Sequence, residues 1–493
     1  MPHMETKQNK PAEGWAERPR QDRCPHFRKC GGCQLQNMEY PRQLAWKQAR
    51  AERLLSPFCQ VAPILGMEHP YHYRNKVQAA FAPGRGGAPV SGVYQSSTHR
   101  VVPVDSCQIE DETADRIIVD IRKMMKSFRI TPYDEAAERG LLRHVLVKRG
   151  FSTGQVMVVL VTSSPVFPSR NNFVKALLRL HPEITTILLN VNKMHTSLVL
   201  GEDERVLYGP GYIEDVLCGL TFRISAKSFY QINPVQTEVL YRTAISLAGL
   251  TGQETVVDAY CGVGTIGLAA SRQAGRVIGV ELNRDAVRDA ITNARRNRIA
   301  NARFYAGDAG EFMTAMAQEG ESAGVVFLDP PRAGSSQAFL SALARLGPQR
   351  VVYISCNPET QARDLRFLTA HGYRALTAQP VDMFPWTEHV ETVVLLSKGE
   401  IDSKKVRVEF SLEDMDMSGF QKGATYEQIK AYVLKHTGLK VSSLYISQVK
   451  RKCGLDVGQN YNLSKKEDAK VPQCPPEKEA AIMEALKHFQ MLE

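Results

Sequence analysis

After Pro234 the chain alternates between short apolar runs and stretches of helical length, and this rhythm restricts the possible folds more than any other feature. The apolar runs lie at residues 254–259, 276–282, 302–309, 324–332, 350–358 and 391–398. Strands that alternate with helices favour a parallel, doubly wound sheet whose ligands bind at the carboxyl ends of the strands. The sequence therefore predicts an α/β, Rossmann-like domain over residues 231–398.

A glycine-rich segment follows the first of these expected strands. Residues 262–267 read GVGTIG, which satisfies G-x-G-x-x-G with Gly262 and Gly264, and Glu281 ends the next strand. Such glycines allow a tight turn and a close approach of the backbone to a ligand, while the carboxylate accepts hydrogen bonds from ribose hydroxyls. The motif alone indicates a nucleoside-containing cofactor, either a dinucleotide or S-adenosylmethionine.

A thiol and a carboxylate follow at two later strand ends. Cys356 stands directly after the apolar run VVYIS, and Glu391 directly precedes the run TVVLL. If both runs belong to one sheet, the two side chains face the same crevice. A nucleophile and a proton acceptor held in this way indicate covalent catalysis, to which a general base typically contributes ~10²–10⁴-fold.

The strand end at Asp329 narrows the chemistry further. In enzymes that methylate exocyclic amines, a comparable DPP or NPP is followed by an aromatic residue that stacks on the base, whereas here Arg332 follows. This favours a ring carbon over an amine as the target. C5 of a pyrimidine becomes nucleophilic only after a thiolate adds at C6, and the C5 proton must then be removed before the thiolate leaves. Cys356 and Glu391 meet these two requirements.

Cysteines cluster near the N-terminus. Cys24, Cys30 and Cys33 are separated by five and two residues, and the glycine pair between the last two permits a sharp turn. A tetrathiolate site needs a fourth ligand, for which Cys107, at the end of a short apolar segment, is the best candidate. Four thiolates fit either zinc or an iron–sulfur cluster, and the spacing does not choose between them.

The cysteines and the glycine motif together keep a rival class open, an iron–sulfur oxidoreductase that uses a nicotinamide or flavin nucleotide. Two features count against this rival. The glycine motif lies in the middle of the chain, and it is followed by the DPP strand end and the Cys–Glu pair. An enzyme that transfers hydride needs neither of the last two.

Residues 71–225 show a different pattern, short alternating runs separated by turn residues. This predicts a β-rich region of antiparallel strands, interrupted by helices near residues 112–127 and 169–180. Basic residues occur at intervals along the strands, and a sheet face that carries them can follow a phosphate backbone. The candidates for RNA contact in this region are Arg74, Lys76 and Arg143.

Composition favours a polyanionic partner. The 493 residues carry a formal net charge of +10, which is typical of proteins that bind nucleic acid. No run of eighteen apolar residues occurs, and the polar N-terminus lacks the apolar core of a secretory signal. We therefore expect a cytoplasmic monomer without a membrane segment, whose ten cysteines are reduced and whose cysteine cluster serves metal binding or catalysis.

Taken in order, the motifs resemble those of the RNA uracil-C5 methyltransferase family, in particular its iron–sulfur-containing branch that acts on 23S ribosomal RNA. The resemblance covers roughly residues 21–398. It rests on CPHFRKCGGCQLQ with Cys107, and then on SFYQIN, DAYCGVGTIG, GVELNRDAV, LDPPR, SCNP and DMFPWTEHVE.

This resemblance implies a class I methyltransferase domain that uses S-adenosylmethionine to methylate C5 of a uridine in RNA. It implies Cys356 as the nucleophile and Glu391 as the base that removes the C5 proton. Ribosomal RNA is the favoured substrate, and transfer RNA stays open because the pocket chemistry is the same. The residues expected to bind the cofactor and line the pocket are Gln231, Tyr260, Gly262, Gly264, Glu281, Asp308 and Asp329.

The resemblance also assigns roles outside this pocket. It implies a [4Fe–4S] cluster whose ligands are Cys24, Cys30, Cys33 and Cys107. It places Phe229 where the family has an aromatic residue that stacks on RNA bases. We add Arg332 to the expected RNA contacts.

The two ends of the chain depart from the family pattern. Many members begin with a small β-barrel, which twenty polar residues cannot form, so we expect a disordered tail at residues 1–20. An iron–sulfur and β-rich domain is expected at residues 21–230. Residues 403–493 form an α-rich extension with a basic cluster, Lys450 to Lys452, after a two-helix pattern. We hypothesise that the extension contacts RNA, although a protein-interaction or packing module fits equally well.

Overall fold

In the computed structural model, the residues described are 24–399 without 97, 99 and 195–197, together with 426–453, 474–489 and 491. The chain divides into two compact units, Met1–Ile401 and Asp402–Glu493. The tail expected at residues 1–20 lies outside the described residues.

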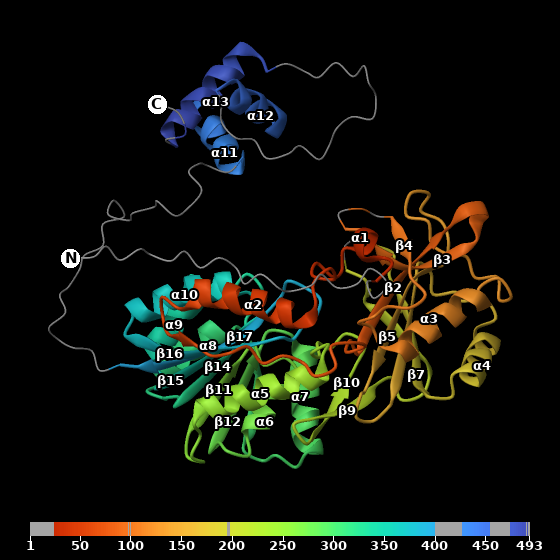
Figure 1. Cartoon of the computed structure of the whole chain (residues 1–493), viewed down its shortest axis with the longest axis horizontal. Coiled ribbons are helices and arrows are strands. Elements are labelled where there is room, and N and C mark those ends of the chain that lie inside the picture. The colour runs from red at the N-terminus through yellow and green to blue at the C-terminus, as the bar shows by residue number, and fades with distance from the viewer. Residues whose placement is uncertain are drawn as a thin grey trace, which may run out of the picture. The chain divides into compact units, whose positions relative to one another are not determined.

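The first unit contains an eight-stranded sheet with parallel strands at its centre (Figure 1). In spatial order these are β13 (Ala302–Ala306), β12 (Arg276–Glu281), β11 (Thr255–Ala259), β14 (Val325–Leu328) and β15 (Arg350–Ser355). Beyond β15 the sheet continues with β17 (Glu391–Lys398), β16 (Tyr373–Val381) and β1 (Gln60–Val61). β17 is antiparallel to both of its neighbours. The predicted doubly wound α/β domain is confirmed.

Helices cover both faces of this sheet because successive strand residues point to opposite sides. One face, with Val256, packs on α5 (Pro234–Ala248), α6 (Thr265–Ala270) and α7 (Arg284–Arg296). The other face, with Val257, packs on α2 (Tyr40–Leu55), α8 (Ala309–Gln318), α9 (Gln337–Leu346) and α10 (Pro358–Ala370). Both faces are therefore buried, which explains the near-continuous apolar runs of the central strands.

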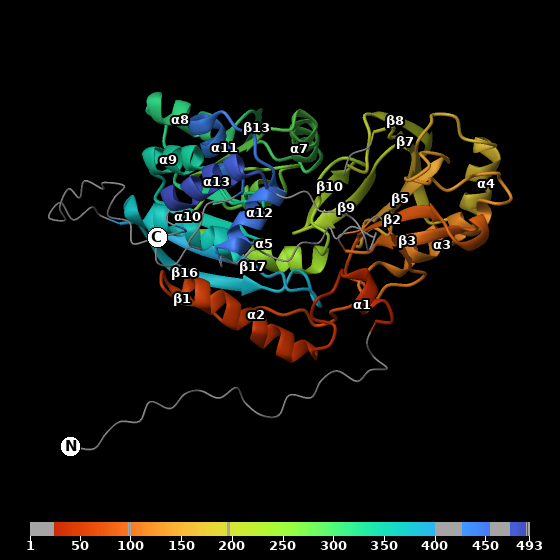
Figure 2. The ribbon, with the colours of Figure 1, turned by 90° about the horizontal axis from the view of Figure 1, so that it is seen from above.

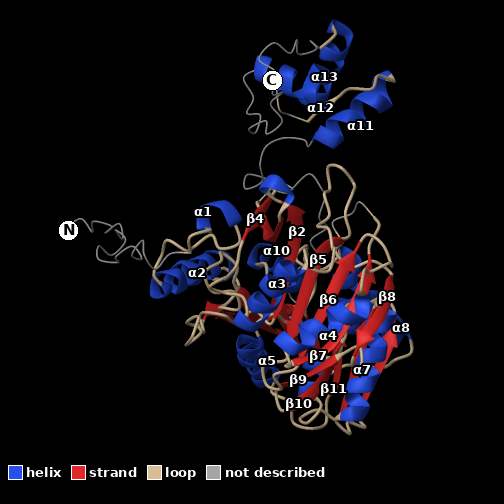
Figure 3. Cartoon of the chain, turned by 90° about the vertical axis from the view of Figure 1, so that its right-hand side faces the viewer, coloured by secondary structure: helices blue, strands red, loops and turns tan. Residues whose placement is uncertain are grey.

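A seven-stranded sheet forms the β-rich region. Its spatial order is β4 (Val101–Pro103), β3 (Pro89–Tyr94), β2 (Lys76–Pro83), β5 (Leu142–Arg149), β6 (Val156–Thr162), β7 (Ile184–Val191) and β8 (Asp203–Tyr208). One face packs on α3 (Glu112–Met124) and α4 (Arg170–Leu180) (Figure 3). The strands are antiparallel as predicted, except that β6 and β7 are parallel, because α4 forms a crossover between them. A 3₁₀ turn (Arg85–Gly87) separates β2 from β3.

The two sheets share one hydrophobic core. The hairpin of β9 (Ile213–Leu217) and β10 (Leu220–Ile224) lies between them, and its Phe222 packs in the same cluster as Leu146 of β5 and Leu240 of α5. Figure 2 shows β9 and β10 between the two sheets. Two segments that precede residue 230, α2 and β1, pack on the eight-stranded sheet rather than on the β-rich region. The short helix α1 (Phe27–Cys30) ends with the clustered Cys30, and the carbonyl of Cys24, which precedes the helix, accepts from the N–H of Phe27 at 3.1 Å.

The second unit consists of α11 (Tyr426–Thr437), α12 (Ser443–Lys452) and α13 (Pro476–His488). Ile429, Ile446 and Ile482, one from each helix, are fully buried in its core. The basic cluster at the end of α12 is not a uniformly charged surface, because Lys450 is buried and Lys452 pairs with Glu479 of α13. Among the helices described in either unit, none is long and apolar enough to cross a membrane.

Candidate functional site

A cavity of about 710 Å³ lies at the carboxyl ends of the central strands. It adjoins β11 and β14, the neighbours from which the remaining parallel strands extend in opposite directions. Such a switch in strand order is where doubly wound sheets bind their ligands. The predicted residues that line the cavity are Lys76, Phe229, Gln231, Tyr260, Gly262, Glu281, Asp308, Asp329, Arg332, Cys356 and Glu391.

The glycine loop forms one end of this cavity. Gly264 precedes α6 with φ of 82°, and a Cβ there would lie 2.9 Å from the ring of Phe304, so glycine is required. At Gly262 a Cβ would meet nothing within 4 Å, which leaves the backbone open to a ligand. The carboxylate of Glu281 accepts hydrogen bonds from the backbone N–H groups of Gly262, at 3.1 Å, and Asn283, at 2.8 Å. Its orientation is therefore fixed by the loop.

Tyr260 and Asp308 complete this end. Tyr260 has φ of 64°, uncommon for a residue with a side chain, and its ring packs against Phe339 with centroids 5.0 Å apart. Asp308 caps α8, because its Oδ1 accepts from the N–H groups of Gly310 and Glu311. The positive φ of Tyr260 is a strained backbone conformation, and such conformations concentrate at functional sites. The aromatic ring, the carboxylates and the exposed glycine backbone suit a nucleoside.

Cys356 and Glu391 lie at the other end. β15 and β17 pair with Ser355 opposite Thr392, so the next residues outward, Cys356 and Glu391, lie opposite each other. The prediction that both runs belong to one sheet is confirmed. Glu391 is buried, Cys356 is half-buried, and Arg332 lies within hydrogen-bonding reach of the thiol. A thiol, a carboxylate and a guanidinium thus share one wall of the cavity.

Burial sets the acidity of these groups. It raises the pKa of the Cys356 thiol to about 11, with the charges of Glu391 and Asp329 adding to the rise and Arg332 opposing it. Burial also raises the pKa of Glu391 well above its usual range, again with Asp329 adding and Arg332 opposing. Burial raises the pKa of Asp329 to about 7. Arg332 therefore opposes the pKa rise of two of these three acidic groups, Cys356 and Glu391, and burial disfavours the ionised form of all three.

The basic residues predicted to contact RNA have different environments. Lys76 lines the cavity, whereas Arg74 lines the separate cavity that holds the clustered cysteines. Arg143 is buried, and its Nη1 donates to the carbonyl oxygens of Asn192, at 2.8 Å, and Met194, at 3.0 Å. These contacts give Arg143, on the interior strand β5, a structural role in supporting a neighbouring loop.

The sequence-based prediction did not name two residues as site residues: Lys148, which supports the loop before Phe229 from outside the cavity, and Phe384, which lines the cavity. Lys148 is buried, and its Nζ donates to the carbonyls of Ser225, at 2.8 Å, and Ser228, at 2.9 Å. Burial lowers the pKa of Lys148 to about 7. It anchors the loop before Phe229, whose side chain is 64% exposed. Phe384 also lines the cavity, and the signal for it was its place within DMFPWTEHVE.

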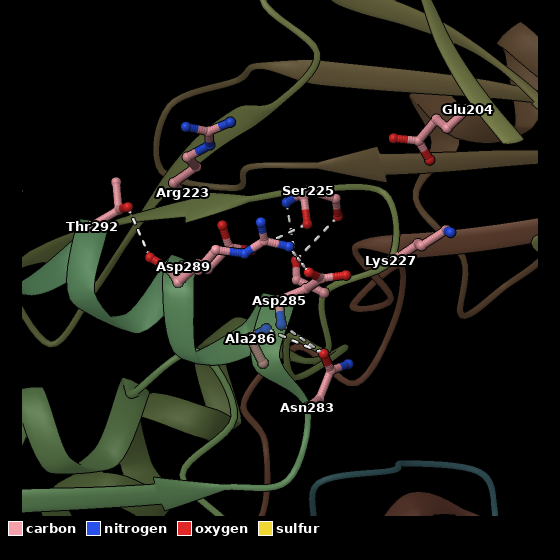
Figure 4. Close-up of a pocket in the computed structure, with 11 residues that line it drawn as sticks. Glu204, Arg223, Ser225, Lys227, Asn283, Asp285, Ala286, Asp289 and Thr292 are labelled. Atoms are coloured by element: carbon pink, nitrogen blue, oxygen red, sulfur yellow. Dashed lines mark hydrogen bonds and ion pairs between the residues drawn. The ribbon is translucent and has the colours of Figure 1, made fainter. Parts of the chain in front are cut away.

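A second cavity of about 410 Å³ adjoins the loop before Phe229 and the first turns of α7 (Figure 4). Its charged lining residues are Arg223, Lys227 and Arg288 with Glu204, Asp285 and Asp289. Arg288 pairs with Asp285, and Lys227 pairs with Glu202 at 3.2 Å. Because its positive and negative charges balance, this cavity does not favour a phosphate group.

A third cavity, about 310 Å³, is lined by all four clustered cysteines, Cys24, Cys30, Cys33 and Cys107. The ten cysteines of the chain are free thiols. Within the described residues, no three His, Cys, Asp or Glu side chains are close enough to hold one metal ion. Burial raises the pKa of Cys33 to about 11, so a metal would have to displace a proton from this thiol. The predicted cysteines therefore share one cavity without closing around a single ion.

Comparison with protein families gives one clear result. Residues 39–399 match the family described as tRNA (Uracil-5-)-methyltransferase. An uncharacterized RNA methyltransferase of Halalkalibacterium halodurans is 43% identical over 378 residues, 76% of this chain and 82% of the relative. A relative of the same description from Clostridium tetani is 41% identical over 378 residues, with the same two coverages.

One solved structure is similar in both fold and sequence. It is the tRNA (uracil-54, C5)-methyltransferase of Pyrococcus abyssi in complex with S-adenosyl-L-homocysteine. The TM-score is 0.63 at 28% identity, and the match covers 74% of this chain and 85% of that one.

Proposed function

Because the chain belongs to the tRNA (Uracil-5-)-methyltransferase family, we propose that it transfers a methyl group from S-adenosylmethionine to C5 of a uridine in RNA. One observation carries the proposal. A single cavity has a nucleoside-binding wall at one end, with Glu281 and the glycine loop, and Cys356 opposite Glu391 at the other. The oxidoreductase alternative is not retained, since the family and its relatives are RNA methyltransferases.

The chain's own residues would carry the covalent chemistry. The Cys356 thiolate adds to C6 of the uracil, which forms an S–C6 bond and places electron density on C5. S-adenosylmethionine supplies the electrophilic methyl group that C5 then takes up. The Glu391 carboxylate accepts the C5 proton, the C5–C6 double bond re-forms, and the S–C6 bond breaks to return the thiolate. Arg332 stabilises the thiolate by its charge.

Arrival of the cofactor would also prepare the base. The sulfonium of S-adenosylmethionine is a cation, and it would enter a site in which burial disfavours the charged forms of Asp329, Cys356 and Glu391. Its charge lowers the pKa values of Glu391 and Asp329, which favours the carboxylate that accepts the proton. Base and cofactor are thereby coupled before any bond forms.

The target uridine would leave its RNA stack to reach Cys356. Unstacking costs about a few kcal/mol and is smallest in loops. Phe229, exposed at the cavity, offers an aromatic surface to a base, and Lys76 offers a charge to the backbone. Arg332, at the catalytic end, is the further residue that we expect to contact the substrate.

Two variants test this mechanism. Cys356→Ala should form no covalent RNA adduct and should not methylate. Glu391→Gln should form the adduct and accumulate it, because the C5 proton has no acceptor. Gels run under denaturing conditions with RNA and methyl-labelled cofactor separate the two results. Methylation of RNA by Cys356→Ala would overturn the proposal.

Ribosomal RNA is the substrate that we favour, because the cysteine motif, CPHFRKCGGCQLQ with Cys107, resembles that of the branch acting on 23S ribosomal RNA. Transfer RNA is the second candidate, supported by the similarity to a tRNA (uracil-54, C5)-methyltransferase. Mapping 5-methyluridine in both RNAs from a deletion strain distinguishes them, because only the true substrate loses the modification.

We further propose that Cys24, Cys30, Cys33 and Cys107 hold a [4Fe–4S] cluster. Each iron of such a cluster takes one thiolate, so its ligands lie farther apart than those of a single zinc ion. Four thiols around a cavity fit this donor set. The cluster has no electron to supply in the reaction above, so a structural role follows. Iron and sulfide analysis of anaerobically purified protein tests the assignment.

A further inference from the structure

The segment between β16 and β17, residues 382–390, leads into Glu391, and we call it the base loop. Side chains or N–H groups from other elements bind its carbonyl oxygens at 2.7–3.0 Å. The donors are Gln236 to Asp382, Asn233 to Met383, Lys47 to Phe384, Tyr73 to Pro385, Leu35 to Trp386 and Arg50 to Glu388. Four of these six donors come from residues 35–73, more than 300 positions away in sequence.

Trp386 lies at the centre of this loop. It is 2% exposed and has φ of 71°, a conformation that surrounding contacts must hold in place. Its backbone N–H donates to Gln43 Oε1 at 2.9 Å, and its indole Nε1 donates to the carbonyl of Pro70 at 2.5 Å. Its ring lies 5.1 Å from that of Tyr71. The N-terminal segment therefore fixes both the backbone and the indole of Trp386.

A buried ion pair holds the start of the same loop. Lys47 Nζ lies 2.5 Å from Asp382 Oδ1, and neither side chain is exposed. The other oxygen of Asp382 accepts from the Tyr40 hydroxyl at 2.8 Å. If the two side chains moved apart, each would leave an uncompensated charge in the interior. We therefore expect α2 and the base loop to keep one relative position.

The apolar cluster around Trp386 adjoins the cysteine cavity, because Ile109 belongs to the cluster and also lines the cavity. Trp386 forms one apolar cluster with Met67, Tyr73 and Ile109, against which Cys33 and Cys107 pack. These cysteines come from two separate segments of the chain, and both line the cysteine cavity. The position of Trp386 thus depends on how these two segments are held together.

The other end of the base loop reaches the catalytic cavity, which Phe384 and Glu391 line. We propose that Trp386 is a positioning residue for Glu391, and that filling of the cysteine cavity sets the geometry of this base through it. The inference rests on the proposed function, and it gives the cysteine cavity a defined task, the proton-removal step. Proton transfer requires the acceptor within hydrogen-bonding reach, so small displacements of Glu391 slow it strongly.

Trp386→Phe tests the inference in the full chain. It keeps an aromatic ring but removes the indole donor to Pro70. Covalent addition by Cys356 should persist, whereas kcat should fall at least 10-fold and methylated RNA adduct should accumulate at steady state. Trp46→Phe is the matched control, because Trp46 is 38% exposed on α2, does not line the catalytic cavity, and is replaced by a ring that can still lie under Arg50. It should behave like the unmodified protein.

The possible outcomes distinguish failure of the inference about Trp386 from failure of the proposed function. If Trp386→Phe turns over like the control with no excess adduct, the inference is overturned and the proposed function stands. If adduct formation and turnover fall in the same proportion, Trp386 merely supports folding and the inference is again overturned. If the unmodified protein forms no adduct with RNA, the proposed function itself fails.

A spectroscopic readout tests the link independently of turnover. With Trp15→Phe and Trp46→Phe, Trp386 is the remaining tryptophan, so fluorescence reports its surroundings. Removal of iron by a chelator should shift its emission to the red and raise adduct accumulation together. Unchanged emission after iron removal, with a folded far-ultraviolet spectrum, would overturn the link.

Discussion

The catalytic cavity and the cysteine cavity contain the same chemical groups in different frameworks. Each combines half-buried cysteine side chains with an arginine and a carboxyl group: Arg332 and Glu391 beside Cys356, and Arg74 and Glu110 beside the clustered cysteines. Burial is the largest cause of the raised thiol pKa in both. The residue types that line a cavity therefore do not show whether its thiols act as a nucleophile or as metal ligands.

The backbone elements that carry the thiols do distinguish these two roles. Cys356 and Glu391 stand at paired strand ends in the interior of a sheet, which fixes one thiol against one base. The clustered cysteines come from short α1, its flanking loops and the segment after β4, which brings four thiols around one space. One thiol held opposite a rigid base suits bond making, and several thiols on loops suit metal ligation.

The largest effect on methylation and iron content is expected when one cysteine in each cavity is replaced by serine. Cys356→Ser should abolish methylation and adduct formation while iron content stays unchanged. Cys107→Ser should lose most of the iron, form adduct, and turn over at least 10-fold more slowly. Iron analysis beside the adduct assay checks this crossed pattern.

Cys59→Ser is the control for this exchange, since Cys59 is half-buried against the methyltransferase core and lines neither cavity. Loss of iron in Cys356→Ser would erase the distinction drawn between the two cavities.

Arg332→Gln should shift the pH profile. Arg332 opposes the rise of the pKa of Cys356 and of Glu391, so its removal raises both pKa values further. The acid limb of kcat/KM should move to higher pH, with a loss of about 10- to 100-fold at pH 7 that shrinks at pH 9. Arg332→Lys retains a charge and should shift less. A loss independent of pH would contradict the electrostatic role.

Lys148→Met tests a cation that supports the cavity without entering the chemistry. Two carbonyls would lose their donor, which should lower the free energy of unfolding by about 1–3 kcal/mol. Folding lowers the pKa of Lys148 from 10.5 to about 7, so between these values the unfolded chain binds more protons. The stability of the unmodified protein relative to the variant should therefore rise with pH across this window.

Urea denaturation at pH 7 and pH 9 measures this difference. Lys126→Met, at an exposed position, is the control and should change neither stability nor its pH dependence. A Lys148→Met penalty that falls toward pH 9 would contradict the assigned sign.

The smallest effect concerns RNA binding by the β-rich region. Lys76→Met should weaken affinity and reduce the slope of log affinity against log salt by about one, as expected for loss of one phosphate contact. Arg143→Met should leave that slope unchanged, because its guanidinium is bound to backbone carbonyls. Salt titrations with one RNA compare the two variants directly.

Much of the fold followed from local pattern. The alternation after Pro234 predicted the doubly wound sheet, and the motifs at strand ends predicted the residues that line its cavity. Strand ends are informative because parallel strands bring them to one edge whatever the details of packing.

Other features depend on partners distant in sequence. The polar stretch at Tyr40–Leu55 indicated a helix but not that it covers the catalytic sheet. Arg143 and Lys148 look alike in sequence to Lys76, yet tertiary contacts turn the first two into buried anchors. Trp386 within DMFPWTEHVE gave no sign of its donors near residues 35–73.

The pairing of β1 with β16 bears on the order of synthesis. Gln60 pairs with Thr377, so the segment made early completes its sheet only after the last strands have been translated. At 5–20 residues per second, the ribosome needs about 15–60 s to cover that distance. The two cysteine-bearing segments and α2 therefore lack their final contacts while the rest of the chain is being synthesised. Packing of Cys33 and Cys107 against the cluster that contains Trp386 would accordingly be a late event in the maturation of this enzyme.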